Sequence, residues 1–551
     1  MVETVQAQKK PIGQLLKEKG YLQDEQIDFA LKEQKATGER VGEVLTRLGI
    51  VTEFEMAQVL ADQTGLAFWD PRGVAPEPRA LRKIPPGFAR DRSVLPFKLE
   101  DGMLHVAVGD PMDRGVQDGL ASFVGSRCKT YVGPAAEIRR IAERHYHFLQ
   151  NPPEQNLQNL QSRLAANPNT PFSMDDLWTD LLNYAILNRA TDVHLSPTDR
   201  TTRFFVRTDG FLELAFVFPL VVHQRLISSL KARAGMDIAE QRLPQDGRWR
   251  FPFMGEMYDL RISTVRSPFG ENLVIRLLPT QAVVLPLDSL GFSREEVRSM
   301  ESLFRKPYGM ILISGPTGSG KTTTLYSALR MLDVIHLNVL TAEDPVEYRF
   351  PLIRQTQVAE DIGYDFADAV RHFLRQDPDV ILIGEIRDEK TAGMAVRAAM
   401  TGHLVLSTVH ANNALAVIAR LRDMSVSLDL LATTLLGTTA QRLVRKVCPY
   451  CRAPYRPNAE LLARYELPAD RDYFCGTGCA TCRGRGYLGR TAVTEILRVS
   501  EACRGLIAEG KPLREFMNLL AAEGFQDMRA SAARKIAAGE TTVEEAERVL
   551  G

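Results

Sequence analysis

The feature that constrains this chain most is a glycine-rich loop between a strand-like run and a helical one. The run MILIS (310–314) is apolar enough for a buried strand, and TTTLYSALRML (322–332) has helical spacing. Between them, GPTGSGKT (315–322) has the pattern GxxxxGK[ST] of a phosphate-binding loop. Such a loop points backbone N–H groups at phosphate oxygens, while Lys321 neutralises their charge and Thr322 offers a hydroxyl to Mg²⁺. The predicted nucleotide contacts are Gly315, Pro316, Thr317, Gly318, Ser319, Gly320, Lys321, Thr322 and Thr323.

A second buried strand lies about sixty residues further on and ends in an acid. In VILIGEIRD (380–388), the run VILI precedes Glu385. Neighbouring parallel strands end at the same edge of a sheet, so this carboxylate is expected beside the phosphates. There it can orient a water for in-line attack, which makes Glu385 the candidate base. Two further segments, AEDPVEYRF (342–350) and TGHLVLSTVHANN (401–413), contain acids and histidines that carry little weight by themselves.

Length and composition limit the number of domains and the classes of function that the chain can have. At roughly 150 residues per domain, 551 residues predict three or four domains. Lys plus Arg and Asp plus Glu number 68 each, so no overall charge attracts nucleic acid or anionic lipid. The sequence has neither the roughly 18 apolar residues of a membrane span nor the apolar core of a signal peptide. We therefore expect a cytoplasmic protein that binds no nucleic acid, does not insert into the membrane and reaches it only through partners.

The first sixty residues contain an internal repeat. The segment PIGQLLKEKGYLQDEQIDFALKEQ (11–34) is echoed by RVGEVLTRLGIVTEFEMAQVLADQ (40–63) at an offset of 29 residues. In each copy two glycines punctuate short apolar helices, and apolar residues recur at helical spacing. The repeat predicts two copies of one helical unit.

Changes of pattern divide the remaining chain. Short strand-like runs such as LHVAVG (104–109), followed by an amphipathic stretch, indicate a small α/β domain. NPPEQNLQNLQSRLAANPNTP (151–171) is rich in Asn, Gln and Pro, which predicts a linker. Strands around one helix follow, indicating an α+β domain, and then strand and helix alternate as in a parallel sheet. The prediction is a multidomain α/β protein with domains at 1–65, 66–150, 172–284 and 285–551, and a linker at 151–171.

Four of the seven cysteines form two CxxC pairs near the C-terminus. Without an export signal, this spacing favours metal binding over disulfides. Four thiolates in tetrahedral reach suit structural zinc, with no open position for water. Cys475 is an alternative ligand because it lies four residues before Cys479. The predicted zinc ligands, in a module spanning 448–482, are Cys448, Cys451, Cys479 and Cys482.

Together these motifs resemble a known family. GPTGSGKT, AEDPVEY, RQDPDVILIGEIRD (375–388) and TGHLVLSTVHANN are similar to the four boxes of the secretion ATPases that drive type II secretion and type IV pili. The likeness extends to ATDVHLSP (190–197), VRTDG (206–210) and LPQDGR (243–248), to the cysteine module and to GETTVEEAERV (539–549). It implies a RecA-like ATPase domain behind a PAS-like α+β domain, with ATP and Mg²⁺ as cofactors.

The resemblance also assigns roles to individual residues. It implies that Glu385 is the catalytic glutamate, that Glu343 and Glu347 belong to the acidic box, and that His403 and His410 lie near the nucleotide. Glu343 and His410 are predicted catalytic residues beside Glu385. This chain has Asn413 where the family usually has Asp.

Arginines of the preceding domain are expected to stabilise charge on the transferred phosphate, because the family packs that domain over the nucleotide. Arg203, Arg207, Arg261 and Arg276 lie on strand-like segments. Of these, Arg207 and Arg261 are the predicted contacts.

The N-terminal repeat resembles the domain of pilus and secretion ATPases that binds cyclic di-GMP. The family motif begins with Arg, which only the second copy keeps, as Arg40, while Pro11 occupies the first. Arginine can stack on a guanine and pair with its edge, and proline can do neither. Cyclic di-GMP binding and a docking role without ligand therefore both stay open. The candidate contacts are Gly13, Gly20, Gln34, Arg40, Gly42, Gly49 and Gln63.

The resemblance as a whole implies a homo-oligomeric motor, expected to be a hexamer, that hydrolyses ATP to ADP and phosphate to assemble a pilus or pseudopilus. Its partners would be an inner-membrane platform protein and a cytoplasmic-domain anchor protein, which hold it at the inner membrane. Type II secretion is favoured over a type IV pilus, and assembly over retraction, since retraction ATPases lack the cysteine module. Two other classes stay open: a nucleotide-binding scaffold, against which Lys321 and Glu385 argue, and a DNA-translocating ring, against which neutral charge argues.

Overall fold

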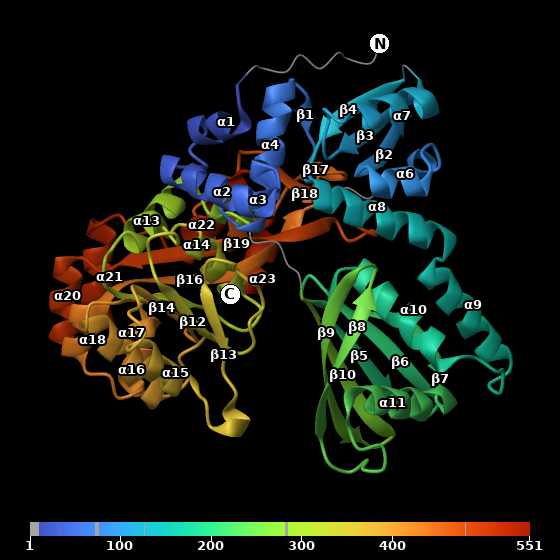
Figure 1. Cartoon of the computed structure of the whole chain (residues 1–551). Helices are drawn as coiled ribbons and strands as arrows, with labels where there is room; N and C mark the ends of the chain where they lie inside the picture. The colour runs from blue at the N-terminus through green and yellow to red at the C-terminus, as the bar shows by residue number, and fades with distance from the viewer. Residues whose placement is uncertain (1–9, 72–75, 126, 281–284, 480) are drawn as a thin grey trace. The chain divides into compact units, whose positions relative to one another are not determined.

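The computed structural model describes residues 10–71, 76–125, 127–280, 285–479 and 481–551 (Figure 1). These divide into two units, 10–15 with 53–280 and 16–52 with 285–551, and each is described by itself. The predicted boundary between the domains at 172–284 and 285–551 falls in 281–284, outside the described residues. Among the helices of the described residues, none is both long and apolar enough to cross a membrane.

The N-terminal repeat is helical, as the sequence predicts. Each copy begins with a seven-residue helix and ends with a longer one. Gly20 and Gly49 end the short helices with φ angles of +77° and +72°, which favour glycine because it has no Cβ. The four helices are α1 (Ile12–Glu18), α2 (Asp24–Thr37), α3 (Val41–Arg47) and α4 (Glu53–Thr64).

A small α/β domain follows the repeat. Its four-stranded sheet has the order β1 (Ala67–Phe68), β4 (Cys128–Val132), β3 (Met103–Val108) and β2 (Val94–Glu100). Buried side chains of the sheet and of α8 share one core, which includes Val106, Ile138 and Tyr146. Its helices are α5 (Pro78–Leu81), α6 (Pro86–Asp91), α7 (Arg114–Val124) and α8 (Ala135–Gln150).

The segment predicted as a linker, 151–171, is instead largely helical. Helix α9 (Pro153–Ala166) packs on α10 (Met174–Leu187), and its Leu157 and Leu164 are buried in the core of the next domain. Leu157, Leu160 and Leu164 recur at helical spacing, a pattern that the Asn- and Gln-rich composition obscures. The chain therefore enters the α+β domain through packed helices.

The α+β domain contains a six-stranded antiparallel sheet in the order β7-β6-β5-β10-β9-β8. Alternate residues of these strands pack with α9, α10 and α11 (Val221–Ala234) in one core, so one face is covered and the other carries polar side chains. The strands are β5 (Ala190–Pro197), β6 (Thr201–Thr208), β7 (Phe211–Pro219), β8 (Gln245–Phe253), β9 (Glu256–Ser267) and β10 (Gly270–Pro279).

The ATPase domain is built on a seven-stranded sheet in the order β13-β12-β14-β15-β11-β16-β19, parallel except for the last strand. Buried residues of β14 alternate between two cores, Ile381 and Ile383 in one and Val380 and Leu382 in the other. Helices therefore cover both faces. The strands are β11 (Gly309–Ser314), β12 (Val339–Glu343), β13 (Arg354–Gln357), β14 (Val380–Ile383), β15 (Leu404–Val409), β16 (Leu435–Val447) and β19 (Tyr487–Arg498).

The helices of this domain divide between the two faces. Helices α13 (Arg294–Phe304) and α14 (Lys321–Leu329) supply one core. The opposite core takes residues from α15 (Phe366–Phe373), α16 (Glu389–Met400), α17 (Ala416–Asp423), α18 (Leu428–Thr434), α20 (Glu501–Ala508) and α21 (Leu513–Ala522).

Strands β16 and β19 form a long antiparallel pair, and the cysteine module is the connection between them. Cys448 directly follows the last residue of β16. The module contains β17 (Arg452–Tyr455), α19 (Ala459–Arg464) and β18 (Tyr473–Gly476). Helices α22 (Met528–Ala537) and α23 (Val543–Leu550) then pack back on β19 and β16.

Candidate nucleotide site and metal centre

The phosphate-binding loop follows the end of β11 and is hydrogen-bonded to the neighbouring strand β16. The side-chain amide of Gln441 donates a hydrogen bond to Ser319 O over 2.7 Å. Gly315 has a φ of +150°, and a Cβ there would lie 2.6 Å from Gln441 O. Only glycine fits so close to another backbone, which explains the first glycine of the motif.

Lys321 lies across this loop at the start of α14. Its Nζ donates to Gly315 O over 2.9 Å and to Pro316 O over 3.2 Å. Burial lowers the pKa of Lys321; the charge of Glu385 opposes this shift and that of Arg442 adds to it. Thr322 is exposed beside Lys321 in the first turn of α14. Polar groups of α14 and the loop thus gather at one end of β11.

The structure brings Glu385 and His410 to the same edge of the sheet. Strands β14 and β15 are parallel neighbours, and these two residues come just after them. Glu385 Oε1 lies 2.9 Å from His410 Nε2, and Oε2 accepts a hydrogen bond from Arg387 Nε over 2.9 Å. The Glu385 side chain is 17% exposed. A half-buried carboxylate oriented from both sides is therefore in electrostatic reach of Lys321.

His403, by contrast, lies at the far end of β15. Its ring nitrogen Nδ1 is 2.9 Å from Ala398 O, and Gly309 N, at the beginning of β11, donates to the carbonyl of His403. Six strand residues separate the two histidines, about 20 Å at roughly 3.3 Å per residue. His403 therefore lies at the end of β15 away from the phosphate-binding loop, against the expectation that it lies near the nucleotide, whereas His410 follows the end of β15 that is next to the loop.

Glu343 ends β12 and is 4% exposed. One carboxylate oxygen accepts hydrogen bonds from Thr341 Oγ1 and, over 3.0 Å, from Gln355 Nε2; the other accepts one from the Tyr326 hydroxyl. Burial raises the pKa of Tyr326, and the charge of Glu343 raises it further. Glu343 therefore joins β12 and β13 to the rear of α14.

Asn413 keeps a helix-capping contact despite its departure from the family pattern. Its Oδ1 accepts a hydrogen bond from Ala416 N, the first residue of α17, over 2.7 Å. Aspartate offers the same oxygen, so the exchange retains the acceptor.

Two residues of this site, Gln441 and Arg442, were not singled out from the sequence. Arg442 donates to Gln441 O over 3.0 Å and to Asn412 O over 2.8 Å. Gln441 is 122 positions from Ser319, its partner, so no local motif reveals the contact. The one available signal is that β16 directly precedes the first CxxC pair.

The predicted arginines belong to one row that crosses the open face of the α+β sheet. Strand register places Arg207 opposite Asp192, Asp192 opposite Arg276, Arg276 opposite Arg261, and Arg261 opposite Arg248. The Arg276 guanidinium contacts Asp192 at 3.2 Å, and Arg207 Nη1 donates to Gly210 O. A concavity of about 410 Å³ is lined by four of these residues, Asp192, Arg248, Arg261 and Arg276.

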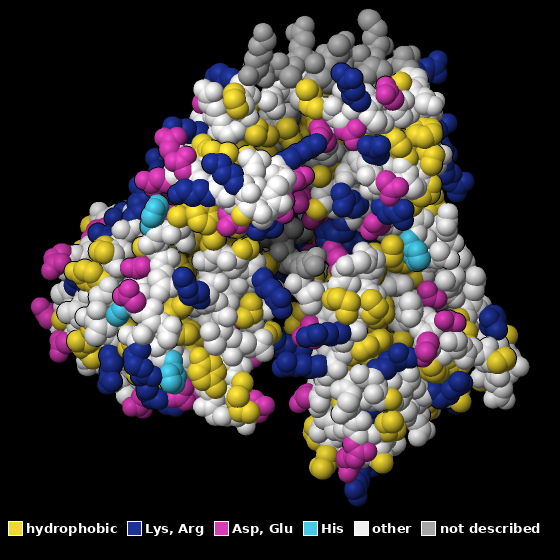
Figure 2. Space-filling model, viewed as in Figure 1, with side chains coloured by type: hydrophobic (Ala, Val, Ile, Leu, Met, Phe, Trp, Pro, Cys, Tyr) yellow, Lys and Arg dark blue, Asp and Glu magenta, His cyan; other side chains and the backbone are white. Residues whose placement is uncertain are grey.

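Arg261 occupies the middle of this concavity. Its Nε is buried and has no hydrogen-bond partner among the residues that the structure describes. Arg203 is exposed on β6 and lies outside the row. Elsewhere on the face visible in Figure 2, basic and acidic side chains are interspersed, in keeping with equal numbers of the two.

In the N-terminal repeat, the two candidate glutamines make equivalent contacts. Gln34 Nε2 donates to Glu39 O over 2.9 Å, and Gln63 Nε2 donates to Lys10 O over 3.0 Å. Each accepting carbonyl belongs to the residue directly before the other copy. Gly13 lies in α1 and Gly42 in α3, and a Cβ on Gly13 would meet nothing within 4 Å. Arg40 directly precedes α3, and its N–H donates to Glu43.

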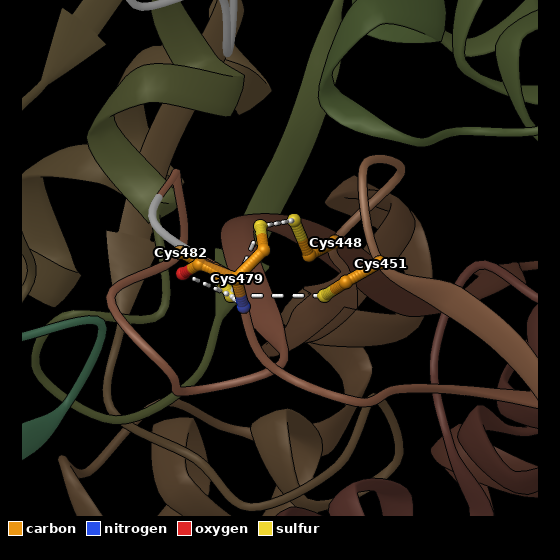
Figure 3. Close-up of side chains that lie close together, drawn as sticks. All are labelled: Cys448, Cys451, Cys479 and Cys482. Atoms are coloured by element: carbon orange, nitrogen blue, oxygen red, sulfur yellow. Dashed lines mark hydrogen bonds between the residues drawn. The ribbon is translucent and has the colours of Figure 1, made fainter.

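Figure 3 shows the four predicted cysteine ligands converging at the tip of the β16–β19 pair. Their sulfur atoms all lie within 4.8 Å of one another. The Cys448–Cys479, Cys451–Cys482 and Cys479–Cys482 sulfur distances are 3.9, 3.7 and 3.7 Å. Four thiolates around zinc at about 2.3 Å would lie about 3.8 Å apart, so the cluster fits a tetrahedral metal.

Backbone N–H groups of this module donate to cysteine sulfur atoms and favour their thiolate forms. Gly478 N donates to Cys451 Sγ, while Cys479 N and Gly486 N donate to Cys482 Sγ. Burial opposes ionisation of Cys482, yet these amides hold its pKa down to about 7. Cys475 lies on β18 opposite Ala453 and is not a member of the cluster, so Cys479 rather than Cys475 is its fourth cysteine.

A parallel sheet covered by helices, with a phosphate-binding loop after one strand and a carboxylate after another, defines a P-loop ATPase. Residues 172–548 match the family model described as type II/IV secretion system protein, and residues 64–151 match the MshEN domain. The chain belongs to the type II/IV secretion system protein family. The MshEN match covers the small α/β domain and nearly all of the repeat lies before it.

Named relatives extend over the whole chain. It is 35% identical to the type IV pilus assembly ATPase PilB of Myxococcus xanthus, over 97% of this chain and 98% of that protein. It is also 35% identical to the type II secretion system protein E of Xanthomonas campestris pv. campestris, over 98% of both chains. The X-ray structure of the ATPase DotB of Legionella pneumophila has a similar fold, with a TM-score of 0.52 and 21% identity over 69% of this chain and 97% of that one. The predicted family, fold class and ATPase activity are therefore confirmed.

Proposed function

We propose that this ATPase is a motor that assembles a pilus or pseudopilus at the cytoplasmic face of the inner membrane. The observation that carries hydrolysis is the grouping of Lys321, Glu385 and His410 at one edge of the sheet. A scaffold that only binds nucleotide needs no oriented carboxylate there. The choice of machine stays between the two systems, because full-length relatives named for each are equally similar.

Hydrolysis needs a held phosphate chain, a metal and an activated water. In this proposal residues 315–323 hold the phosphates of ATP, Thr322 ligates Mg²⁺, and Glu385 orients the attacking water. His410 and Arg387 fix the Glu385 carboxylate from opposite sides. Glu343 positions α14 through Tyr326.

The arginine row is proposed to supply charge to the transferred phosphate. The row has four arginines and one aspartate, and Asp192 contacts Arg276, so the row keeps an excess of positive charge. Arg207 and Arg261 are the proposed contacts, and the register adds Arg248 and Arg276 to the same surface. The motor is proposed to be a hexamer that works with an inner-membrane platform protein and a cytoplasmic anchor protein.

Complementation tests this function and the arginine row together. Deletion of the chain from its source organism should remove surface pili or a set of secreted proteins, and the wild-type chain should restore them. Lys321→Ala and the double variant Arg207→Ala/Arg261→Ala should both fail, since an arginine at the transferred phosphate is worth about 10³-fold or more in turnover. Arg203→Ala is the matched control and should restore function. Unchanged pili and secretion in the deletion strain contradict the function; restoration by the double variant contradicts only the arginine assignment.

For the cysteine cluster we propose structural zinc, held by Cys448, Cys451, Cys479 and Cys482. Such a closed site supplies folding energy and no reactive water. Its position supports this, because the metal would fix the connection between β16 and β19.

For the N-terminal repeat we propose that cyclic di-GMP binds, with Arg40 as the arginine that stacks on and pairs with a guanine. The open space at Gly13 lets a ligand approach the backbone there. Gln34 and Gln63 hold the backbone at the starts of the two copies through their side-chain amides.

Titration of cyclic di-GMP into the full chain, followed by calorimetry, tests this proposal. Arg40→Ala should weaken binding by about tenfold to hundredfold, as expected for loss of one bidentate contact. Pro11→Arg should strengthen it, because it restores the missing arginine. Lys35→Ala, an exposed cation between the copies, is the control and should change nothing. No binding by either the wild type or Pro11→Arg would leave the repeat as a docking module.

A further inference from the structure

The loop after β15 carries His410 to Glu385, and its far end is anchored to the β16–β19 pair. Ala414 N donates to the buried carboxylate of Glu495 on β19 over 2.6 Å. Thr438 on β16 donates to Ala414 O over 2.8 Å. These contacts fix the loop only beyond Asn413, so something else must hold the part next to His410.

Arg442 makes that contact. Its Nη2 donates to Asn412 O, two residues after His410, over 2.8 Å. Its Nη1 donates to the carbonyl of Gln441, which packs against Gly315 while the Gln441 side chain holds Ser319. One guanidinium therefore connects the His410 loop to the strand segment that grips the phosphate-binding loop.

The hydrogen-bond partners of Arg442 are unusual for a half-buried arginine. Both of its hydrogen bonds to described residues go to neutral backbone carbonyls. Arg445, three residues later on the same strand, instead donates to the carboxylate of buried Glu545 over 2.8 Å. Burial lowers the pKa of Arg442, and the charge of Glu495 opposes this shift only in part, so the half-buried cation is kept at a cost in desolvation. Its planar fork presents two N–H groups at a fixed separation, whereas a lysine presents one compact charge on a flexible stem.

We propose that Arg442 is a positioning residue for hydrolysis: it fixes the 410–413 loop, and through that loop the His410 contact on Glu385, relative to the phosphate-binding loop. The inference rests on the proposed role of Glu385 as the base. Loss of the bridge lets His410 move, so the carboxylate is less well oriented when water attacks, while the phosphate contacts stay in place.

A double-mutant cycle in the full chain tests this role. Arg442→Lys keeps the charge and loses the rigid fork that fixes the two carbonyls relative to each other, and it should lower kcat about tenfold with the KM for ATP within about twofold, as expected for misorientation rather than lost binding. His410→Ala should lower kcat to a similar extent. The double variant should be no slower than the slower single variant, because both changes break one chain of contacts. Arg420→Lys, an exposed arginine on α17, is the control and should leave kcat and KM unchanged.

Three results overturn the proposal: an unchanged kcat in Arg442→Lys, a raised KM with kcat intact, or losses that multiply in the double variant. Binding of a fluorescent ADP analogue verifies that each variant is folded, and Arg442→Gln, which can reach one carbonyl, replaces Arg442→Lys if that variant fails to fold. If Glu385→Gln keeps full turnover, the failure lies in the assignment of the base. If Glu385→Gln is inactive and the losses still multiply in the double variant, the failure lies in the role proposed for Arg442.

Discussion

Glu385→Gln is expected to lower ATP turnover by about 10²–10⁴-fold, the range of general-base catalysis. Glutamine keeps the size of the side chain and its contact with His410 and removes the charge that orients water. Nucleotide affinity should be retained or slightly increased, because the change removes one negative charge near the phosphates. Phosphate release in the steady state measures turnover, and binding of a fluorescent ATP analogue measures affinity.

Glu389→Gln is the matched control for this experiment. Glu389 lies four residues later, exposed at the start of α16, and its loss should leave turnover unchanged. Full turnover in Glu385→Gln would show that another acid serves as the base. Glu343 would then be the first to test, although both of its oxygens already accept hydrogen bonds.

Cys482→Ser is expected to reduce bound zinc from about one ion per chain to none and to destabilise the ATPase domain. A ligand present at about 1,000 times its Kd stabilises the folded state by about 4 kcal/mol, and this contribution disappears with the metal. Metal content by atomic absorption and thermal unfolding with and without a chelator measure the two effects. Chelation of the wild-type chain should lower its melting temperature to that of the variant.

Cys475→Ser provides an internal control, since Cys475 lies on β18 outside the cluster. It should keep both the metal and the melting temperature. Loss of zinc in Cys475→Ser with retention in Cys482→Ser would reverse the ligand assignment. A wild-type chain that contains no metal and ignores the chelator would contradict the zinc proposal altogether.

Much of the nucleotide site follows from short-range patterns. The phosphate-binding loop and Glu385 are each set by a strand and the residues directly after it, and both can be placed from the sequence. The error over His403 has the same origin. Both histidines flank one strand, and only the direction of β15 decides which of them reaches the phosphate edge.

Other features depend on contacts that a single sequence does not reveal. The hydrogen bond from Gln441 to Ser319 joins residues that are 122 positions apart in the sequence. The arginine row requires the register of five strands, including the irregular pairing of β5 with β6. Helix α9 is not predicted from the sequence for a different reason. Its polar composition indicates a linker, although three leucines recur at helical spacing. In the first two cases tertiary packing, rather than local propensity, decides the outcome.

The pairing of β16 with β19 has a consequence for how the ATPase domain unfolds. In the middle of β16, Gln441 holds the phosphate-binding loop; Cys448 comes seven residues later, directly after the strand ends. The ladder between them is continuous apart from one irregularity near Arg445. Segments joined in this way open as a single cooperative unit. Amide hydrogens of the phosphate-binding loop and of the cysteine module are therefore expected to exchange with similar protection, although the two sites perform unrelated chemistry.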